Sequence, residues 1–157
     1  MKTLVSYFSA SGVTAKVAAN LAEAVGGDLF EIVPEKLYTS ADLNWQDRQS
    51  RSSVEMNDPT CRPAIKSKVT DFASYDVIFV GFPVWWYREP SIIDTFMEAY
   101  DFTGKIVIPF ATSGSSGIGD SGANMQKLAP GAKVVSGKRV KGNIGIAELK
   151  EWASECL

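Results

Sequence analysis

The sequence contains no histidine and only two cysteines, Cys61 and Cys156, which lie far apart and form no Cys-x-x-Cys pair. Zinc sites are built from histidine and closely spaced cysteine ligands, and catalytic triads use a histidine as the base. These absences therefore exclude zinc clusters, His-based triads and imidazole acid–base chemistry together. Spacing alone leaves open whether the two cysteines form a disulfide.

An excess of basic residues is also missing, because 16 Lys and Arg stand against 18 Asp and Glu, for a formal net charge of -2. Nucleic-acid-binding domains carry a basic surface, so this balance argues against nucleic acid as a partner. No apolar run approaches the roughly 18 residues that a membrane-spanning helix needs. The short run after Lys2 is broken by Ser6 and Ser9, and we interpret it as a strand rather than a signal peptide. We expect a cytoplasmic protein with no membrane or nucleic-acid partner.

The residues that are present suit one globular domain spanning 1–157, since 45% are hydrophobic and 22% are charged. Short apolar runs alternate with segments whose apolar residues recur at helical spacing. Strands are predicted at 4–8, 29–33, 77–81, 105–110 and 133–135. Helices are predicted at 13–25, 64–72, 91–100, 124–128 and 146–156, while 137–142 is left unassigned. This alternation predicts an α/β fold, a doubly wound five-stranded parallel sheet with helices on both faces.

The first strand passes directly into the loop Ser9-Ala10-Ser11-Gly12-Val13-Thr14, which opens the first helix. Unpaired N–H groups and the positive end of the helix dipole favour an anion at such a place. The loop has neither a Walker pattern nor G-x-G-x-x-G, and it contains no Lys, Arg or His. It therefore favours a monophosphate held by N–H and O–H groups alone. The same residue types are also ordinary helix caps, so the loop by itself leaves both interpretations open.

Two further loops follow the third and fourth predicted strands. Three consecutive aromatic residues stand in Pro83-Val84-Trp85-Trp86-Tyr87, and Gly and Ser dominate residues 112–121. Ligands of doubly wound sheets bind beyond the carboxyl ends of the strands, so all three loops are expected at one pocket. Flat side chains with an N–H or O–H tip suit stacking on a planar heterocycle. Core packing is the simpler explanation of any one tryptophan, and the Gly/Ser loop alone is also typical of a flexible surface loop.

Residues 35–63 form a polar stretch that is longer than an ordinary connection in a small domain. Helical turns are expected around 41–55. Connections of this length often act as lids or binding elements, and a solvated excursion without such a role is the alternative.

Three segments carry a resemblance to a known family. Residues 9–14, 75–86 and 104–114 resemble the flavodoxin family, in particular its short single-domain bacterial branch, and the similarity spans nearly the whole chain. The resemblance implies the strand order 2-1-3-4-5, of which flavodoxin is itself the standard example, and one non-covalent FMN at the switch between strands one and three. Two features depart from the family. Val13 replaces the Asn that is usual in the phosphate loop, and the strongly acidic surface common in flavodoxins is missing.

The resemblance also implies which residues bind FMN. The phosphate would be held by Ser9, Ser11, Gly12, Val13 and Thr14. The isoalloxazine ring would be bordered by Pro83, Val84, Trp85 and Trp86 on one side and by Ser113, Gly114, Ser115 and Gly117 on the other. One of Trp85 and Trp86 is expected to stack on the ring and the other to pack. Trp45 and Trp152 are expected to contribute little to the loss of tryptophan emission when FMN binds.

For function, the resemblance favours a flavodoxin-like electron-transfer protein that works with redox partner proteins. FMN carries the redox chemistry itself, so no catalytic side chain and no metal are predicted, in agreement with a chain that lacks histidine. One alternative is an NAD(P)H-dependent FMN or quinone reductase, an oxidoreductase in which residues 35–63 would cover a substrate. The other is an interaction module that keeps the fold and has lost FMN.

Overall fold

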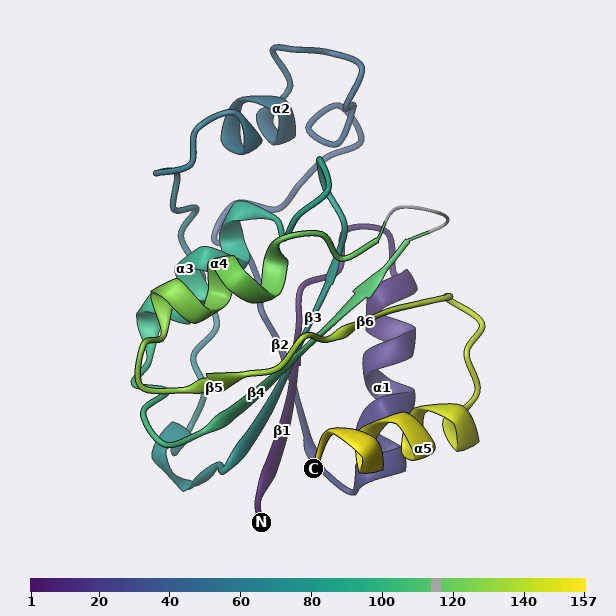
Figure 1. Ribbon diagram of the computed structural model, residues 1–157. Coiled ribbons are helices and arrows are strands. Elements are labelled where there is room, and N and C mark those ends of the chain that lie inside the picture. The colour runs from purple at the N-terminus through teal and green to yellow at the C-terminus, as the bar shows by residue number, and fades with distance from the viewer. Residues whose placement is uncertain (114–116) are drawn as a thin grey trace.

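The structure is a computed structural model that describes residues 1–113 and 117–157 (Figure 1). The strands of its sheet are β1 (Thr3–Tyr7), β2 (Asp28–Glu31), β3 (Val77–Pro83), β4 (Ile106–Thr112), β5 (Lys133–Val134) and β6 (Lys138–Val140). The helices are α1 (Val13–Val25), α2 (Arg51–Met56), α3 (Ser91–Ala99), α4 (Ser121–Leu128) and α5 (Ile146–Cys156), with a 3-10 turn, η1, at Phe72–Ser74. Within the described residues, no helix is long and apolar enough to cross a membrane.

The strands lie in the order β2-β1-β3-β4-β5, and every pair is parallel. The predicted order is thereby confirmed. β3 pairs with β1 on one side and β4 on the other, and it is buried along nearly its whole length. A central strand of a parallel sheet is covered on both faces, which is why this run is the most apolar of the sequence.

Helices cover both faces of the sheet, as predicted (Figure 1). On one face, Leu21 of α1 and Leu149 of α5 are buried in a common apolar cluster. On the other face, Phe96 of α3 and Met125 of α4 are buried in a second cluster. Gly26 ends α1 with a φ of 65°, the left-handed conformation for which helices commonly use glycine.

The fifth position in the sheet is shared by two short strands, β5 beside the first half of β4 and β6 beside the second half. Gly137 between them has a φ of 76°, and a Cβ there would lie 2.5 Å from the carbonyl oxygen of Pro109. Only glycine permits this conformation and this close approach. Residues 137–142, which the sequence left unassigned, thus contain β6, and they bring Val140 level with Thr112 at the carboxyl end of β4.

The helix predicted over 64–72 is wrong, because residues 64–69 contain no helix and only the 3-10 turn η1 begins at Phe72. Ile65 forms an antiparallel bridge with Pro34, and the N–H of Lys66 donates to the carbonyl of Val33 at 2.7 Å. In so short a segment, apolar residues at helical spacing give only a weak preference for a helix. Hydrogen bonds to the chain that leaves β2 override that preference here.

Residues 35–63 lie beyond the carboxyl ends of the strands, at the top of Figure 1. Their helical part is α2 alone, which is shorter than the turns expected around 41–55. Ser50 begins this helix, since its side chain accepts a hydrogen bond from the N–H of Ser53.

Candidate cofactor-binding site

The loop between β1 and α1 is folded around the side chain of Ser9. Its Oγ accepts hydrogen bonds from the N–H of Gly12 at 3.1 Å and of Ala15 at 3.2 Å. Ser9 therefore satisfies one N–H of the first turn of α1, although the N-cap residue itself is Gly12. Gly12 has a φ of 92°, and no described atom lies within 4 Å of a Cβ added there. The glycine is thus required for its backbone conformation rather than for space.

Other N–H groups of the same loop have no partner in the part of the chain that the structure describes. Within residues 1–113 and 117–157, the N–H groups of Ser11, Val13 and Thr14 donate no hydrogen bond. The resemblance assigns Thr14 to the phosphate. Its hydroxyl is instead buried and lies 2.7 Å from the hydroxyl of Thr112 at the end of β4. The loop therefore offers backbone donors at a helix N-terminus, an arrangement that suits a phosphate.

A cleft of about 380 Å³ opens beside these donors. It is lined by Ser11, Val13, Pro83, Thr112, Ser113, Lys141 and Gly142. The three loops expected at one site do meet here. Lys141, just beyond β6, is a residue that sequence reasoning missed, because only the register of β6 beside β4 reveals its place. The loop 9–14 itself carries no cation, as its sequence shows, and Lys141 places one at the same cleft.

The aromatic loop after β3 forms a tight hairpin turn. Trp85 and Arg88 exchange backbone hydrogen bonds of 3.0 and 3.1 Å, and Trp86 and Tyr87 between them have φ of 49° and 64°. This is a type I′ turn, which favours Asn-Gly because both central residues need a positive φ. Two bulky residues in such a conformation cost on the order of 1–3 kcal/mol each. Strain of this kind marks the turn as a candidate functional element.

The loop after β4 lies directly against this turn. Gly119 has a φ of 59°, and a Cβ added there would lie 2.1 Å from the carbonyl oxygen of Tyr87. Any side chain at this position would push the two loops apart. The loops that the flavodoxin resemblance assigns to the two sides of a ring are therefore neighbours in space.

The two adjacent tryptophans have different surroundings. Trp85 is half-buried, and its ring meets those of Phe8 and Tyr38 edge to face, at 5.6 and 5.4 Å between ring centres. Trp86 is 40% exposed. Trp85 is therefore a packing residue, and Trp86 is the candidate for stacking on a bound ring.

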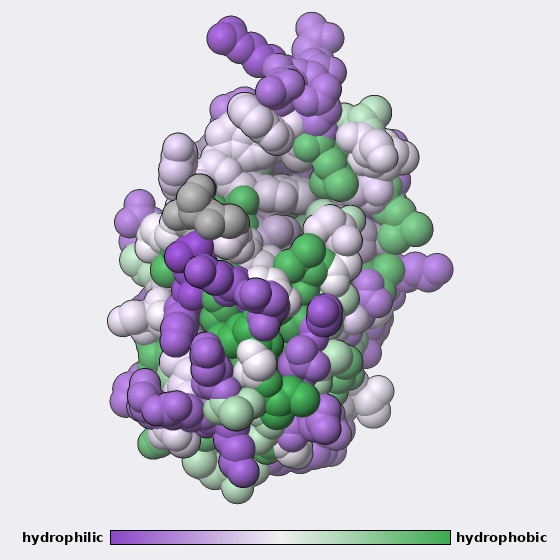
Figure 2. Space-filling view, turned by 90° about the vertical axis from the view of Figure 1, so that its right-hand side faces the viewer, coloured by the Kyte–Doolittle hydropathy of each residue, from purple (hydrophilic) through white to green (hydrophobic). Residues whose placement is uncertain are grey.

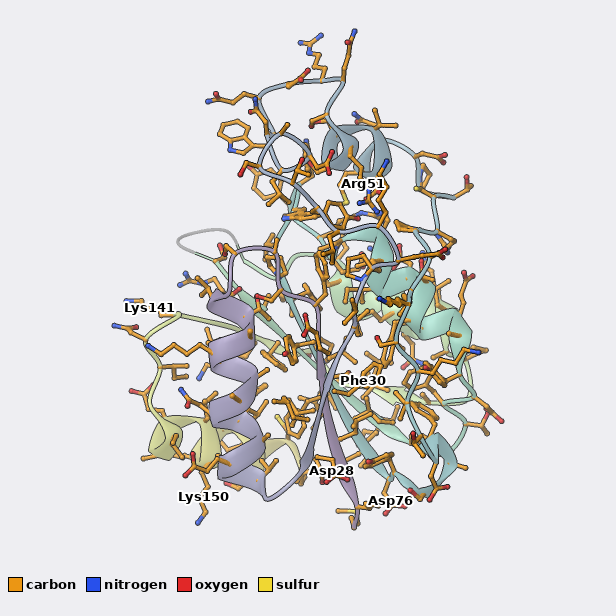
Figure 3. The ribbon with its side chains drawn as sticks, turned by 180° about the vertical axis from the view of Figure 1, so that it is seen from behind. Asp28, Phe30, Arg51, Asp76, Lys141 and Lys150 are labelled. Atoms are coloured by element: carbon orange, nitrogen blue, oxygen red, sulfur yellow. The ribbon has the colours of Figure 1, made fainter. Side chains whose placement is uncertain are left out.

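The same aromatic cluster fixes residues 35–63 to the domain. Arg51, labelled in Figure 3, lies over the ring of Tyr38 with its guanidinium carbon 3.8 Å from the ring centre. Glu55 accepts hydrogen bonds from the hydroxyl of Tyr38 and, at 2.8 Å, from Arg51 Nε. Burial, together with the bond to Glu55, raises the pKa of Tyr38 above its ordinary value. Specific contacts thus hold this segment against the site, and it is not a loosely solvated excursion.

The anchored segment and the aromatic turn enclose a second pocket, of about 430 Å³. It is lined by Leu43, Trp45, Ser52, Val84, Trp85, Trp86 and Tyr87. Trp45 is 69% exposed and lines the same pocket as Trp86, a place that sequence reasoning did not foresee. Trp152, by contrast, is buried against Phe79 and Phe110. Figure 2 shows the side of α1 and α5, where a hollow lies below the projecting top of the molecule.

Comparison with known proteins decides the family. The family model described as flavodoxin matches residues 2–156. The chain belongs to the flavodoxin family. No curated protein matches this chain.

Solved structures include similar flavodoxin-family folds. A Bacteroides eggerthii protein named as a flavoprotein is 48% identical, with a TM-score of 0.93 over 99% of this chain and 97% of that chain. A Bacteroides uniformis protein named in the same way is 50% identical, with a TM-score of 0.92 over 98% and 97%. A flavoprotein from Lactobacillus acidophilus in complex with FMN is 23% identical and shares the fold, with a TM-score of 0.72 over 97% of this chain and 98% of that chain.

In this flavodoxin-family protein, the predicted site residues after β4 are only partly described. Ser113 lines the cleft, and its carbonyl oxygen accepts a hydrogen bond from Arg139 Nη1 at 3.3 Å. Gly117 is exposed and lines neither the cleft nor the aromatic pocket. Gly114 and Ser115 lie outside the described residues.

Two buried carboxyl groups follow the aromatic turn of this flavodoxin-family protein. Glu89 is fully buried and accepts a hydrogen bond from Asn124 Nδ2 at 3.0 Å. Asp94 lies 3.7 Å from Arg88 Nη2, and its Oδ1 has no hydrogen-bond partner among the described residues. Burial, reinforced by the charge of Asp94, raises the pKa of Glu89 to about 7. Burial also raises the pKa of Asp94 to about 6, against the lowering effect of Arg88.

Proposed function

We propose that this chain binds FMN non-covalently and transfers electrons between redox partner proteins. One observation carries the proposal: the cleft beside the unpaired donors of α1 and the aromatic pocket share the end of β3. Pro83 lines the cleft and the next residue, Val84, lines the pocket. A phosphate in the cleft and a planar ring in the pocket would be joined across this shared edge by a short chain. Membership of the flavodoxin family and the FMN in the Lactobacillus flavoprotein support this ligand.

Different residues would bind the phosphate and the ring of FMN. The N–H groups of Ser11, Val13 and Thr14 would hold the phosphate, because they lie at a helix N-terminus and have no other partner among the described residues. Trp86 would stack on the ring, and Trp45 would cover it from residues 35–63 and exclude water. When bound, FMN supplies one-electron and two-electron chemistry, so no side chain has to act as an acid or a base.

A second candidate function is an NAD(P)H-dependent FMN or quinone reductase. It is favoured by a hollow of about 660 Å³ next to the aromatic pocket. This hollow is lined by Trp45, Gln46, Arg48, Ser53, Asn57 and Trp86. Because Trp45 and Trp86 border both hollows, a planar substrate there would lie beside the ring. The third candidate, an interaction module without FMN, has no such observation in its favour.

We also propose a cytoplasmic location. Cys61 and Cys156 are both free thiols. Disulfides are rare in the cytoplasm, and two cysteines that form no bond with each other agree with this compartment.

Spectra of the purified full-length protein test these proposals. Flavin absorbance bands that stay unchanged when NADPH is added without oxygen, and bleach with a reduced redox protein, are the expected result for an electron carrier. Rapid bleaching by NADPH alone would instead identify a reductase. A protein that shows no flavin bands even after FMN is added would contradict FMN binding.

A further inference from the structure

Among the described residues, one exposed basic side chain beside the phosphate loop has no partner for its charge. Lys141 lines the cleft together with Ser11 and Val13. Yet no ion pair or hydrogen bond joins its ammonium group to any residue among 1–113 and 117–157. Figure 3 labels Lys141 on the segment beside the N-terminal end of α1.

The sheet fixes the position of this residue. Val140 is buried and pairs in register with Thr112, so Lys141 is the first residue beyond the carboxyl edge of the sheet. The next residue, Gly142, lies so close to α1 that an added Cβ would be 2.7 Å from Cγ1 of Val13. The backbone of Lys141 is thus held next to the first turn of α1.

The loop supplies less positive charge than a phosphate monoester carries negative charge. The loop residues 9–14 carry no charged side chain, and no Asp or Glu lines the cleft. A helix N-terminus is equivalent to only about half an elementary charge. A phosphate monoester carries about 1.5 to 2 negative charges at neutral pH. The lysine side chain, a point charge on a flexible stem, is suited to make up the difference.

We propose that Lys141 is the counter-charge for the phosphate of FMN and sets a preference for FMN over riboflavin. Riboflavin has the same ring and no phosphate, so it gains nothing from this charge. The inference rests on FMN binding as proposed above. It assigns a ligand-binding role to the segment after β6.

Titration calorimetry of the flavin-free chain with FMN and with riboflavin tests this role. In Lys141→Gln, the Kd for FMN should rise by about twofold to fivefold, the scale of an exposed ion pair, while the Kd for riboflavin stays unchanged. Added salt should weaken FMN binding more in the parent than in this variant. Lys141→Arg keeps the charge and should keep the affinity for FMN. Lys150→Gln, the same charge change on the exposed side of α5, should leave both affinities unchanged.

The outcomes separate this inference from the proposed function. An FMN affinity that is unchanged in Lys141→Gln would overturn the inference and leave FMN binding intact. Equal weakening of FMN and riboflavin would also overturn it, because such a result indicates a structural effect. A parent chain that binds neither ligand would reject FMN binding itself, and the role of Lys141 with it.

Discussion

Gly12 sets the direction in which the loop before α1 presents its N–H groups. Its φ of 92° is costly for any residue with a Cβ and most costly for a β-branched one. We predict that Gly12→Val weakens FMN binding by at least about tenfold, because relieving a strain of roughly 1–2 kcal/mol rotates the adjoining peptide groups. Gly12→Asn is the matched control, since Asn tolerates positive φ and should retain most of the affinity. Calorimetry that gave one affinity for the parent and the valine variant would contradict this role.

The tryptophan pair provides a second test at the residue scale. Trp86→Ala should weaken FMN binding by about tenfold, because it removes the aromatic ring that would stack on the flavin. It should change stability little, because Trp86 is 40% exposed. Trp85→Ala should instead lower the free energy of unfolding by about 2 kcal/mol, because its ring packs on Phe8 and Tyr38. Denaturation and FMN titration of both variants measure the contrast. If neither variant lost affinity, the aromatic pocket would not hold the ring.

At the scale of elements, the hairpin turn after β3 stores strain that a substitution can release. Tyr87 is 75% exposed and has a φ of 64°, so Tyr87→Gly loses little contact and removes the unfavourable conformation. We predict a gain of about 1 kcal/mol in the free energy of unfolding, after the entropy cost of glycine is subtracted. Tyr87→Val should lower it instead, because β-branched residues avoid positive φ. Urea denaturation compares the three proteins, and a glycine variant less stable than the parent would argue against strain at this turn.

Elements whose burial follows from the sheet were predictable from sequence. The run that became β3 is apolar on both faces because it is central, and α1 shows its buried stripe and its terminal glycine. Residues 64–69 were not predictable, since their non-helical form depends on hydrogen bonds to the chain around Val33. The strand β6 was hidden for a similar reason. Its three residues, two of them basic, show no strand pattern, and pairing with β4 alone defines it.

At the scale of the whole molecule, parallel connections bring the ends of β1, β3 and β4 to one edge, so the sequence predicted which loops would meet. It could not predict the additional residues of the site. Trp45 reaches the pocket because Tyr38, 7 residues earlier, anchors the segment on Phe8 and Trp85. Lys141 reaches the cleft through the register of β6. Both placements depend on long-range packing, which carries no local signal.

The buried carboxyl groups couple the stability of the whole domain to pH. Burial raises the pKa of Glu89 from 4.5 to about 7 in the folded protein. Between these values the folded protein binds the proton that the unfolded chain has released, so the free energy of unfolding should fall as pH rises through this window. Asp94 acts in the same direction at lower pH, because burial raises its pKa from 3.8 to about 6.

We therefore predict that Glu89→Gln is more stable than the parent at pH 8 and no more stable near pH 4.5. The full difference, at roughly 1.4 kcal/mol for each unit of pKa, is on the order of 3 kcal/mol. The amide oxygen of the new side chain can still accept the hydrogen bond from Asn124, so the packing around the site is retained. Glu148→Gln, an exposed change on α5, should leave the pH dependence of the parent unaltered. Urea denaturation across this pH range measures all three proteins, and a parent whose stability rises steadily from pH 5 to pH 7 would show that Glu89 is ionised when buried.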